Sequence, residues 1–196
     1  MINLQQIKAF YQLSRDLSFQ DIQVLLKAAQ NQSYIAGEIL IPEGTFKKDL
    51  FFIKKGLVRA FVINKKGDEI TTLLRWEHQL VASLDNIFLD KAATHTYQAL
   101  EPTQVLHLPY DSLQNILAQH PKLEANRKFF FQKHLEEASK KINSFILLSP
   151  EERYLELVDS NPSLVNRVPD KHIAHILGIT PVSLSRIRKR LASKKK

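Results

Sequence analysis

The segment 170–191 limits the possible folds of this chain more than any other stretch. Asp170 can cap a helix, and the small Ala174 is followed four residues later by Gly178, which permits a sharp turn between two closely crossing helices. Thr180 can cap the second helix, with Pro181 at its first position. The pattern predicts a helix-turn-helix unit. Its buried residues, spaced three or four apart within each helix, are expected to be Ile173, Ala174, Leu177, Leu184, Ile187 and Leu191, with Ile179 filling the turn.

The charge of the chain is concentrated in the same region. The chain has 28 Lys and Arg against 20 Asp and Glu, a formal net charge of +8. Residues 167–196 hold nine of the bases and one acid, so residues 1–166 balance to zero. Basic charge on the second helix favours a DNA reader over a helical hairpin with a solvated face. The predicted DNA-binding residues are Thr180, Pro181, Val182, Ser185, Arg186, Arg188, Lys189 and Arg190.

These side chains are expected to divide by role. An arginine can donate two hydrogen bonds to guanine O6 and N7 in the major groove, which predicts that Arg186 reads a base. Val182 is apolar yet lies opposite the buried face, where it can contact a thymine methyl group. Arg188, Arg190 and the terminal lysines are expected to contact phosphates. Ser185 and Lys189 fit either role.

The spacing of glycine predicts β structure in the first half of the chain. Four of the five glycines fall at positions 37, 44, 56 and 67, with β-branched or aromatic runs between them. Regular turns of this kind are typical of an antiparallel sandwich or barrel. We expect strands at residues 39–41, 50–53, 57–63, 70–74, 78–81, 96–99 and 103–108, a hairpin tip at 64–68 and a short helix within 84–93.

Helical periodicity marks residues 1–30 and returns near Pro109, and Pro121 can open a long helix that runs to Leu147. Apolar residues alternate along it by four and three, which favours dimerisation over packing against the chain's own barrel. This seam consists of Phe131, Leu135, Ala138, Ile142 and Phe145. A capping box at residues 149–152 then predicts a new helix. The predicted domains are residues 1–120, 121–148 and 149–196.

The glycine-punctuated β-roll, the long helix and the helix-turn-helix unit together resemble the Crp/Fnr family of bacterial transcription regulators, particularly a branch found in Bacteroidetes. Residues 37–44, 52–59 and 168–191 carry the resemblance, which covers nearly the whole chain. It implies an α+β fold with an N-terminal antiparallel, jelly-roll-like sensor domain, a dimerisation helix and a C-terminal helix-turn-helix domain. It also implies a homodimer on a palindromic DNA operator, with RNA polymerase as a candidate protein partner.

The sequence departs from this family at two places. Members that bind cyclic AMP use a Gly-Glu pair and an arginine, and alignment places these at Ala82-Ser83 and Ala93. A buried phosphate without a matched cation is costly, so we expect an unknown effector, or none, rather than a cyclic nucleotide. In the recognition helix, Val182 replaces the usual glutamate, which predicts a different half-site. The polar candidates for an effector pocket are Arg59, Arg75, Trp76, Ser83, Asn86, His95 and Thr96.

Two other classes of function remain open. A ligand-sensing module that regulates a protein partner is the first alternative, although the localised charge argues against it. A cupin-like metal enzyme is the second, but the chain has no His-x-His motif. His172 and His175 are three residues apart without a third ligand nearby, and we expect them on the exposed side of their helix, near phosphates.

The composition excludes further chemistry. Cysteine is absent, which rules out disulfides, thiolate metal sites and a cysteine nucleophile. No catalytic signature brings serine, histidine and aspartate together. We therefore expect no enzyme, no metal and no cofactor. The sequence also has no apolar run of about 18 residues and no signal segment, so we expect a cytoplasmic protein without a membrane partner.

Overall fold

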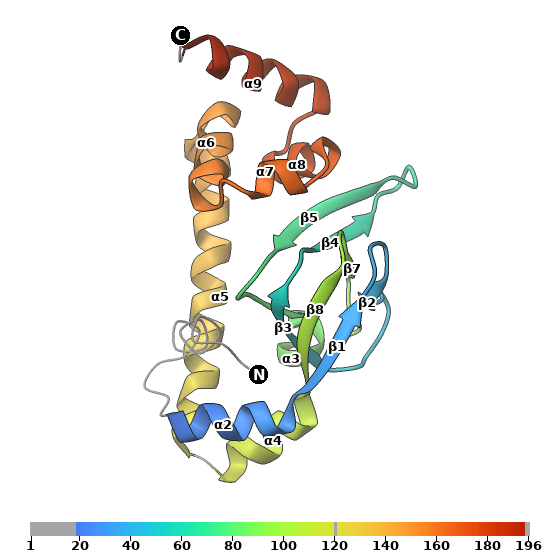
Figure 1. Cartoon of the computed structure of the whole chain (residues 1–196), viewed down its shortest axis with the longest axis vertical. Helices are drawn as coiled ribbons and strands as arrows, with labels where there is room; N and C mark the ends of the chain where they lie inside the picture. Colours follow the sequence, from blue (N-terminus) through green and yellow to red (C-terminus); the bar gives the residue numbers. More distant parts are fainter. Residues whose placement is uncertain (1–18, 120, 195–196) are drawn as a thin grey trace. The chain divides into compact units, whose positions relative to one another are not determined.

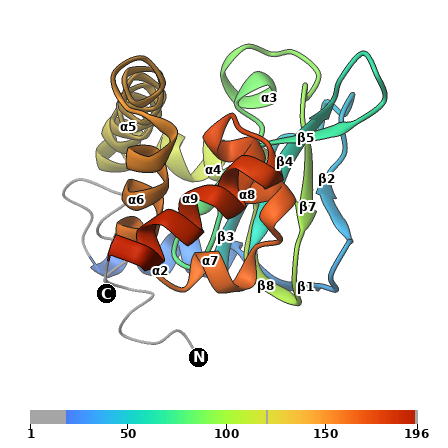
Figure 2. The ribbon, with the colours of Figure 1, turned by 90° about the horizontal axis from the view of Figure 1, so that it is seen from above.

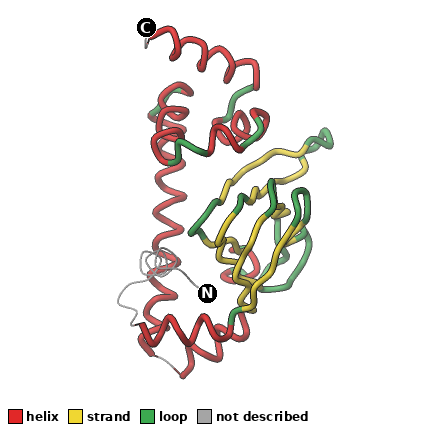
Figure 3. The backbone as a smooth tube through the Cα atoms, in the orientation of Figure 1, coloured by secondary structure: helices red, strands yellow, loops and turns green. Residues whose placement is uncertain are grey.

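The computed structural model describes residues 19–119 and 121–194 (Figure 1). Contacts divide the chain into two compact units, Met1–Val62 with Leu74–His134 and Ile63–Leu73 with Leu135–Lys196. The strands lie between Gln30 and Pro109, and from Tyr110 onward the described elements are all helices. Figure 3 colours the strands yellow and the helices red. Within the described residues, no helix is long and apolar enough to cross a membrane. The three domains predicted above stay a prediction.

Eight strands form two four-stranded sheets within the described residues. The order in one sheet is β1-β8-β3-β6, and in the other it is β2-β7-β4-β5. The pairs β1–β8, β3–β8, β3–β6, β2–β7 and β4–β7 are antiparallel. The strands are β1 (Gln30–Tyr34), β2 (Ile39–Ile41), β3 (Asp49–Lys55), β4 (Val58–Ile63), β5 (Glu69–Arg75), β6 (Leu80–Ala82), β7 (Thr96–Ala99) and β8 (Thr103–Pro109).

Several helices begin or end at the capping and turn residues that the sequence predicted. They are α2 (Phe19–Ala28), α3 (Leu84–Phe88), α4 (Tyr110–Gln119), α5 (Pro121–Leu147), α6 (Pro150–Ser160), α7 (Leu164–Arg167), α8 (Asp170–Leu177) and α9 (Pro181–Lys194). The structure confirms the long helix from Pro121 to Leu147 and the helix-turn-helix pair α8–α9. The helix α7 was not predicted. The prediction for residues 1–18 lies outside the described residues.

The core of the β-roll explains why its strands form. β3 is buried along its first five residues, and Phe51, Ile53 and Val105 are almost completely inaccessible to solvent. At the tip between β4 and β5, the Asn64 side-chain oxygen accepts backbone N–H bonds from Lys66 (2.8 Å) and Asp68 (3.0 Å). Gly67 supplies the positive φ of +86° that this tip needs. The α+β fold with an antiparallel β-roll is therefore confirmed.

The polar strand β1 differs from the prediction, which placed a helix up to residue 30. Its sequence, Gln-Asn-Gln-Ser-Tyr, has no apolar alternation that would mark a strand. Pairing with β8 determines its conformation, with Gln32 opposite Val105. The Gln32 amide nitrogen also lies 3.0 Å from Nδ1 of the buried His107, whose Nε2 contacts Asp49 at 2.7 Å. These contacts between distant segments stabilise a strand that local propensity does not favour.

The C-terminal helices are defined by their caps. Ser149 and Glu152 make both reciprocal bonds of the predicted capping box at the start of α6. Asp170 does not cap α8 as predicted, because Pro169 holds the cap position and Asp170 is the first helical residue. Gly178 ends α8 in the left-handed conformation, with φ 66° and ψ 35°. Beyond this turn, α9 lies over α8 (Figure 2).

Candidate nucleic-acid interface

The helix α9 has one buried and one exposed face. Leu184 is completely buried and Ile187 nearly so, and both belong to the apolar core that α8 supplies with Ile173, Ala174 and Leu177. The exposed face carries a stripe at spacings of three and four, and Val182 within it is 60% exposed. The stripe consists of Val182, Ser185, Arg186 and Lys189, which are four of the residues predicted to bind DNA.

The start of α9 is fixed by the residues that the sequence predicted for that purpose. The Thr180 hydroxyl accepts a hydrogen bond from the Ser183 backbone N–H at 3.1 Å, and Pro181 is the first helical residue. Both are exposed, so they also border the surface next to Val182. The exposed stripe therefore begins at the first turn of a capped helix.

Arg188 lies in a different environment from the one predicted. Its Nε donates to the Tyr154 hydroxyl at 3.1 Å, and its Nη1 donates to Asp170 at 2.7 Å. Partial burial lowers the pKa of the guanidinium, but the hydrogen bonds to Tyr154 and Asp170 outweigh burial and leave the pKa raised. Arg188 is thus a half-buried charged group bonded to two other helices, and its predicted phosphate contact stays a prediction.

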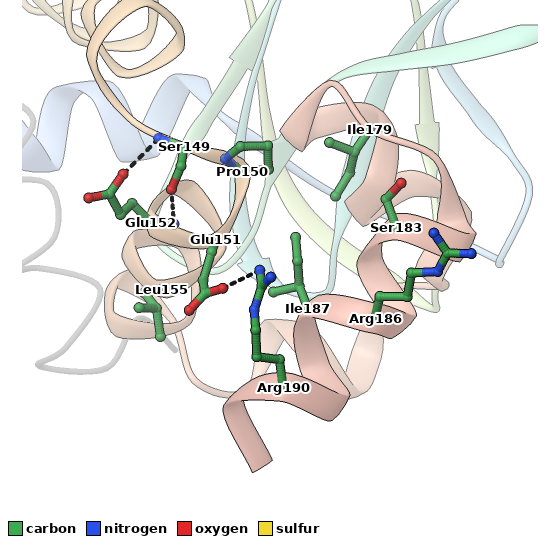
Figure 4. A pocket seen from close by; sticks show the side chains of 10 residues that line it. All are labelled: Ser149, Pro150, Glu151, Glu152, Leu155, Ile179, Ser183, Arg186, Ile187 and Arg190. Atoms are coloured by element: carbon green, nitrogen blue, oxygen red, sulfur yellow. Dashed lines mark hydrogen bonds and ion pairs between the residues drawn. The ribbon is translucent and has the colours of Figure 1, made fainter. Parts of the chain in front are cut away.

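Arg190 also has an acidic neighbour. It forms an ion pair with Glu151 at the start of α6, beside a pocket of about 640 Å³ (Figure 4). Arg190 is turned toward Glu151 in this view, whereas Arg186 points away from that pair. The pocket is lined by Ser149, Pro150, Glu151, Glu152, Leu155, Ile179, Ser183, Arg186, Ile187 and Arg190.

Arg153 of α6 joins the end of the α5 segment to the helix-turn-helix unit. Arg153 donates to the carbonyl oxygens of Leu148 (2.6 Å) and Leu177 (3.0 Å), and its guanidinium carbon lies 4.5 Å from the centre of the Phe145 ring. A Cβ at Gly178 would lie only 2.7 Å from Cε1 of that ring. Phe145, predicted as part of the dimer seam, therefore also packs against the turn of its own chain.

The histidines of α8 do not occupy the solvent-facing position predicted for them. Both are half-buried. Nδ1 of His172 lies 2.8 Å from the Thr71 hydroxyl, and Nδ1 of His175 accepts the Thr71 backbone N–H at 3.2 Å. Lys141 of α5 donates to the neighbouring carbonyl of Thr72 at 2.6 Å. The hairpin between β4 and β5 therefore contacts α8 and α5 within one unit.

The apolar seam along α5 is exposed in the single chain. Leu135 is 62% and Ile142 59% exposed, and Ala138 is also exposed. Phe131 contacts Phe88 of α3, with 5.0 Å between ring centres, and yet remains 46% exposed. The structure thus presents an apolar stripe of the kind that a second helix covers.

Several residues predicted for an effector pocket also make hydrogen bonds within the fold, and their binding role stays a prediction. Arg59 is buried and its Nε donates to Gln98 at 2.8 Å. Ser83 is buried as the cap of α3, and the Asn86 amide donates to the carbonyls of Thr45 (2.8 Å) and Lys91 (2.7 Å). The buried Thr96 hydroxyl accepts the backbone N–H of Glu43. These four side chains hold neighbouring segments together.

The remaining pocket candidates, Arg75, Trp76 and His95, lie at the end of β5, just after it and just before β7, and their role in binding an effector stays a prediction. Arg75 and Trp76 end β5 and follow it, and both are half-buried. The Trp76 backbone N–H donates to Gln79. His95 lies beside Thr94, with 2.9 Å between Nδ1 and the hydroxyl oxygen. Burial and the Asp85 carboxylate raise the pKa of the neighbouring Tyr97 to about 12, so Tyr97 is neutral at physiological pH.

Ala93 and Ser83, the positions at which the resemblance places the arginine and glutamate of cyclic-AMP-binding members, are both bonded within the fold. Ala93 is buried, its N–H donates to Thr45 and its carbonyl accepts from Gly44. The Ser83 hydroxyl accepts the backbone N–H of Asn86 as the cap of α3. Neither position supplies a cation for a phosphate or a carboxylate for a ribose. Among the residues described, no three His, Cys, Asp or Glu side chains form a metal-binding group.

The sequence did not reveal the partners that hold the recognition helix. These partners come from α6 and α8, and each is bonded to an arginine of α9: Tyr154 and Asp170 to Arg188, and Glu151 to Arg190. The only signal in the sequence was that α9 carries three arginines, which do not all lie on one face of the helix. Burial of the adjacent flanks decides which of them turn inward.

Comparisons with known protein families and sequences match part of the chain. A family model of the cyclic nucleotide-binding domain matches residues 31–120. The fumarate and nitrate reduction regulatory protein of Vibrio cholerae is 31% identical over 87 residues, which cover 44% of this chain and 34% of that protein. The match therefore spans about a third of that relative's length.

Solved structures show a similar fold over most of the chain. FixK2 from Bradyrhizobium japonicum gives a TM-score of 0.74 at 14% identity, covering 85% of this chain and 86% of that one. The catabolite activator protein of Thermus thermophilus gives 0.58 at 20% identity, covering 93% and 87%. The β-roll, the long helix and the C-terminal helices therefore occur together in known proteins.

Proposed function

We propose that the chain is a regulator of the Crp/Fnr type, a homodimer that binds DNA sequence-specifically and controls transcription; the matching cyclic nucleotide-binding domain, the partial match to a regulatory protein and the shared fold support this proposal. The observation that carries the proposal is the exposed stripe of α9, where Val182, Arg186 and Lys189 face outward from a packed helix-turn-helix. The regional charge of +8 provides the attraction to a polyanion.

In this proposal α9 enters the major groove, which is wide enough for an α-helix. Arg186 donates two hydrogen bonds to a guanine, and Val182 contacts a thymine methyl group. Lys189 and the terminal lysines neutralise phosphates, which positions the protein without specifying sequence. Arg190 joins them only if DNA replaces Glu151 as its partner. Since Val182 cannot accept a hydrogen bond from cytosine, the half-site differs from that of relatives with glutamate there.

Dimerisation brings two such helices to one operator. The exposed stripe on α5, with Leu135 and Ile142 at its middle, pairs with the same stripe of a second copy. Two recognition helices related by a two-fold axis read half-sites about 34 Å apart on a palindromic operator. A regulator of this kind acts in the cytoplasm, where the DNA lies, and RNA polymerase is its natural protein partner.

We assign no cyclic nucleotide as the effector. The positions of the family's glutamate and arginine are held by the cap Ser83 and the buried Ala93, and the nearby Arg59 is already bonded to Gln98. A signal for this β-roll is therefore a different small molecule, or the protein acts without one. The relatives are regulatory proteins, which agrees with a function in binding rather than catalysis.

In vitro selection of bound DNA, followed by gel shifts, tests the proposal. Arg186→Ala is expected to weaken binding to the selected site by about 10- to 100-fold, because one bidentate base contact is lost. Weak, salt-sensitive binding to unrelated DNA remains. Deleting Lys194–Lys196 is the matched control, because it weakens binding to all sequences about equally. No shift at low salt with any genomic fragment would contradict the proposal and favour a module that regulates a protein partner.

A further inference from the structure

Arg188 occupies a special place among the basic residues of α9. Its side chain is 30% exposed, and its two bonds reach different helices, α6 through Tyr154 and α8 through Asp170. The guanidinium carbon also lies 5.7 Å from the centre of the Tyr154 ring. Tyr154 itself is buried. Three helices of the unit thus meet at one side chain.

Two other kinds of contact hold α9: the ion pair of Arg190 with Glu151 of α6, which joins only one further helix, and apolar packing. Leu184 and Ile187 bind α9 to the core through apolar contacts, which are non-directional and tolerate a rotation of the helix about its axis. The hydrogen bonds of Arg188 are directional and weaken steeply with angle. A planar guanidinium held at two of its nitrogens therefore sets the rotation of α9.

We propose that Arg188 is a positioning residue for base readout, holding α9 at the rotation that presents Arg186 to the DNA. The inference rests on the proposed DNA-binding function. Arg186 lies two residues earlier on the exposed face, so a rotation of α9 displaces its guanidinium directly. A bidentate contact to guanine requires both bonds to be aligned, and a displacement of about 1 Å is enough to disrupt it.

The proposal differs from a phosphate contact in what it predicts for salt. A residue that binds phosphate contributes about one unit to the slope of log affinity against log salt, and its loss weakens binding to every sequence. A positioning residue contributes to specific binding only. Arg188 is expected to affect the ratio of specific to non-specific affinity and to leave the slope unchanged.

Asp170→Asn separates the two roles, because it replaces the charged bond to Arg188 with a weaker neutral one while making the protein more positive. If Arg188 positions α9, this variant loses about 10- to 100-fold in affinity for the selected operator and little for unrelated DNA. If Arg188 served phosphates, the variant would bind all DNA more tightly. Asp159→Asn is the matched control, since it removes an exposed acid of α6 with the same change in charge and is expected to preserve specificity.

Fluorescence anisotropy with labelled operator and unrelated DNA, at several salt concentrations, measures these quantities. Arg188→Gln is expected to lower specific affinity without changing the slope, and Lys189→Gln to lower the slope by about one. If Arg188→Gln does not fold by circular dichroism, Asp170→Asn and Tyr154→Phe give the result. A reduced slope in Arg188→Gln, or unchanged specificity in Asp170→Asn, overturns the proposal. Absence of specific binding by the unmodified protein would instead refute the DNA-binding function itself.

Discussion

At the scale of one residue, both the backbone conformation and the packing at position 178 require glycine. Its φ of +66° is unfavourable for other residues, and a Cβ there would meet the Phe145 ring at 2.7 Å. We expect Gly178→Ala to lower the free energy of unfolding by about 2–4 kcal/mol, of which about 1 kcal/mol reflects the backbone and the rest overpacking. Urea unfolding measures the difference.

Gly67 provides the matched control. Its φ is +86°, but no atom lies within 4 Å of the position that a Cβ would take. Gly67→Ala is therefore expected to cost only the backbone part, about 1 kcal/mol. Phe145→Leu in the Gly178→Ala background should recover part of the loss, since it removes the atoms that collide. Equal losses at the two glycines would show that the contact with Phe145 is unimportant.

Single residues also show where the sequence was sufficient and where it failed. Leu184, Ile187 and Ile173 were predictable as buried, because helical spacing alone places them on one face. Arg186 and Arg188 lie two positions apart, and the sequence assigned a base to the first and phosphate to the second, but no local pattern showed that Arg188 is bonded to two other helices. Their difference depends on Tyr154 and Asp170, which approach α9 only in the folded chain.

At the scale of elements, the start of α6 carries a charge-dependent cap. Hydrogen bonds with Ser149 lower the pKa of the Glu152 carboxyl below its ordinary value of 4.5. A lowered pKa in the folded state means that the stabilisation is present above the unfolded pKa and is lost as pH falls through the folded one. The ionised carboxylate accepts the Ser149 backbone N–H at 2.7 Å.

Glu152→Gln tests this dependence, because glutamine keeps the shape but not the charge. Its melting temperature is expected to lie below that of the unmodified protein at pH 7, and the gap should close as the pH falls below about 4.5. Thermal melts followed by circular dichroism between pH 3.5 and 7 measure the gap. A gap that is the same across this range would mean that the charge of Glu152 contributes nothing.

The elements differ in how far local sequence determines them. Caps and turns identified α5, α6, α8 and α9, because a proline, a serine or a glycine acts on its immediate neighbours. The strand β1 was missed because its five polar residues gain their conformation from β8, more than 70 positions later. The hairpin contact of Thr71 with His172 and His175 was missed for the same reason.

At the scale of the whole molecule, the stripe on α5 predicts a dimer that can be broken. Leu135→Asp with Ile142→Asp places two charges in the middle of the proposed seam and should give monomers by sedimentation. These positions are better probes than Phe131, which also contacts Phe88 of its own chain. Lys140→Asp with Asn143→Asp adds the same residues to the exposed helix outside the stripe. This control is expected to remain dimeric, and a dimer in both variants would refute the seam.

The order of β-roll, long helix and helix-turn-helix was predictable because each part carries its own periodicity. The effector pocket was not. Arg59, Ser83 and Asn86 were predicted to line the pocket as polar residues of the β-roll, and the structure shows that each also makes hydrogen bonds within the fold. Composition cannot distinguish a polar group that waits for a ligand from one already bonded within the fold.

The bonds of Arg153 have a consequence for the geometry of the operator. They join the carbonyl of Leu148, the residue after α5, to the last carbonyl of α8 through one side chain, so the joint between the long helix and the DNA-reading helices resists bending. A joint of this kind cannot stretch to follow displaced half-sites. One inserted base pair at the operator centre turns a half-site by about 35° and moves it by about 3.4 Å. The protein is therefore expected to discriminate between operators by length as well as by sequence.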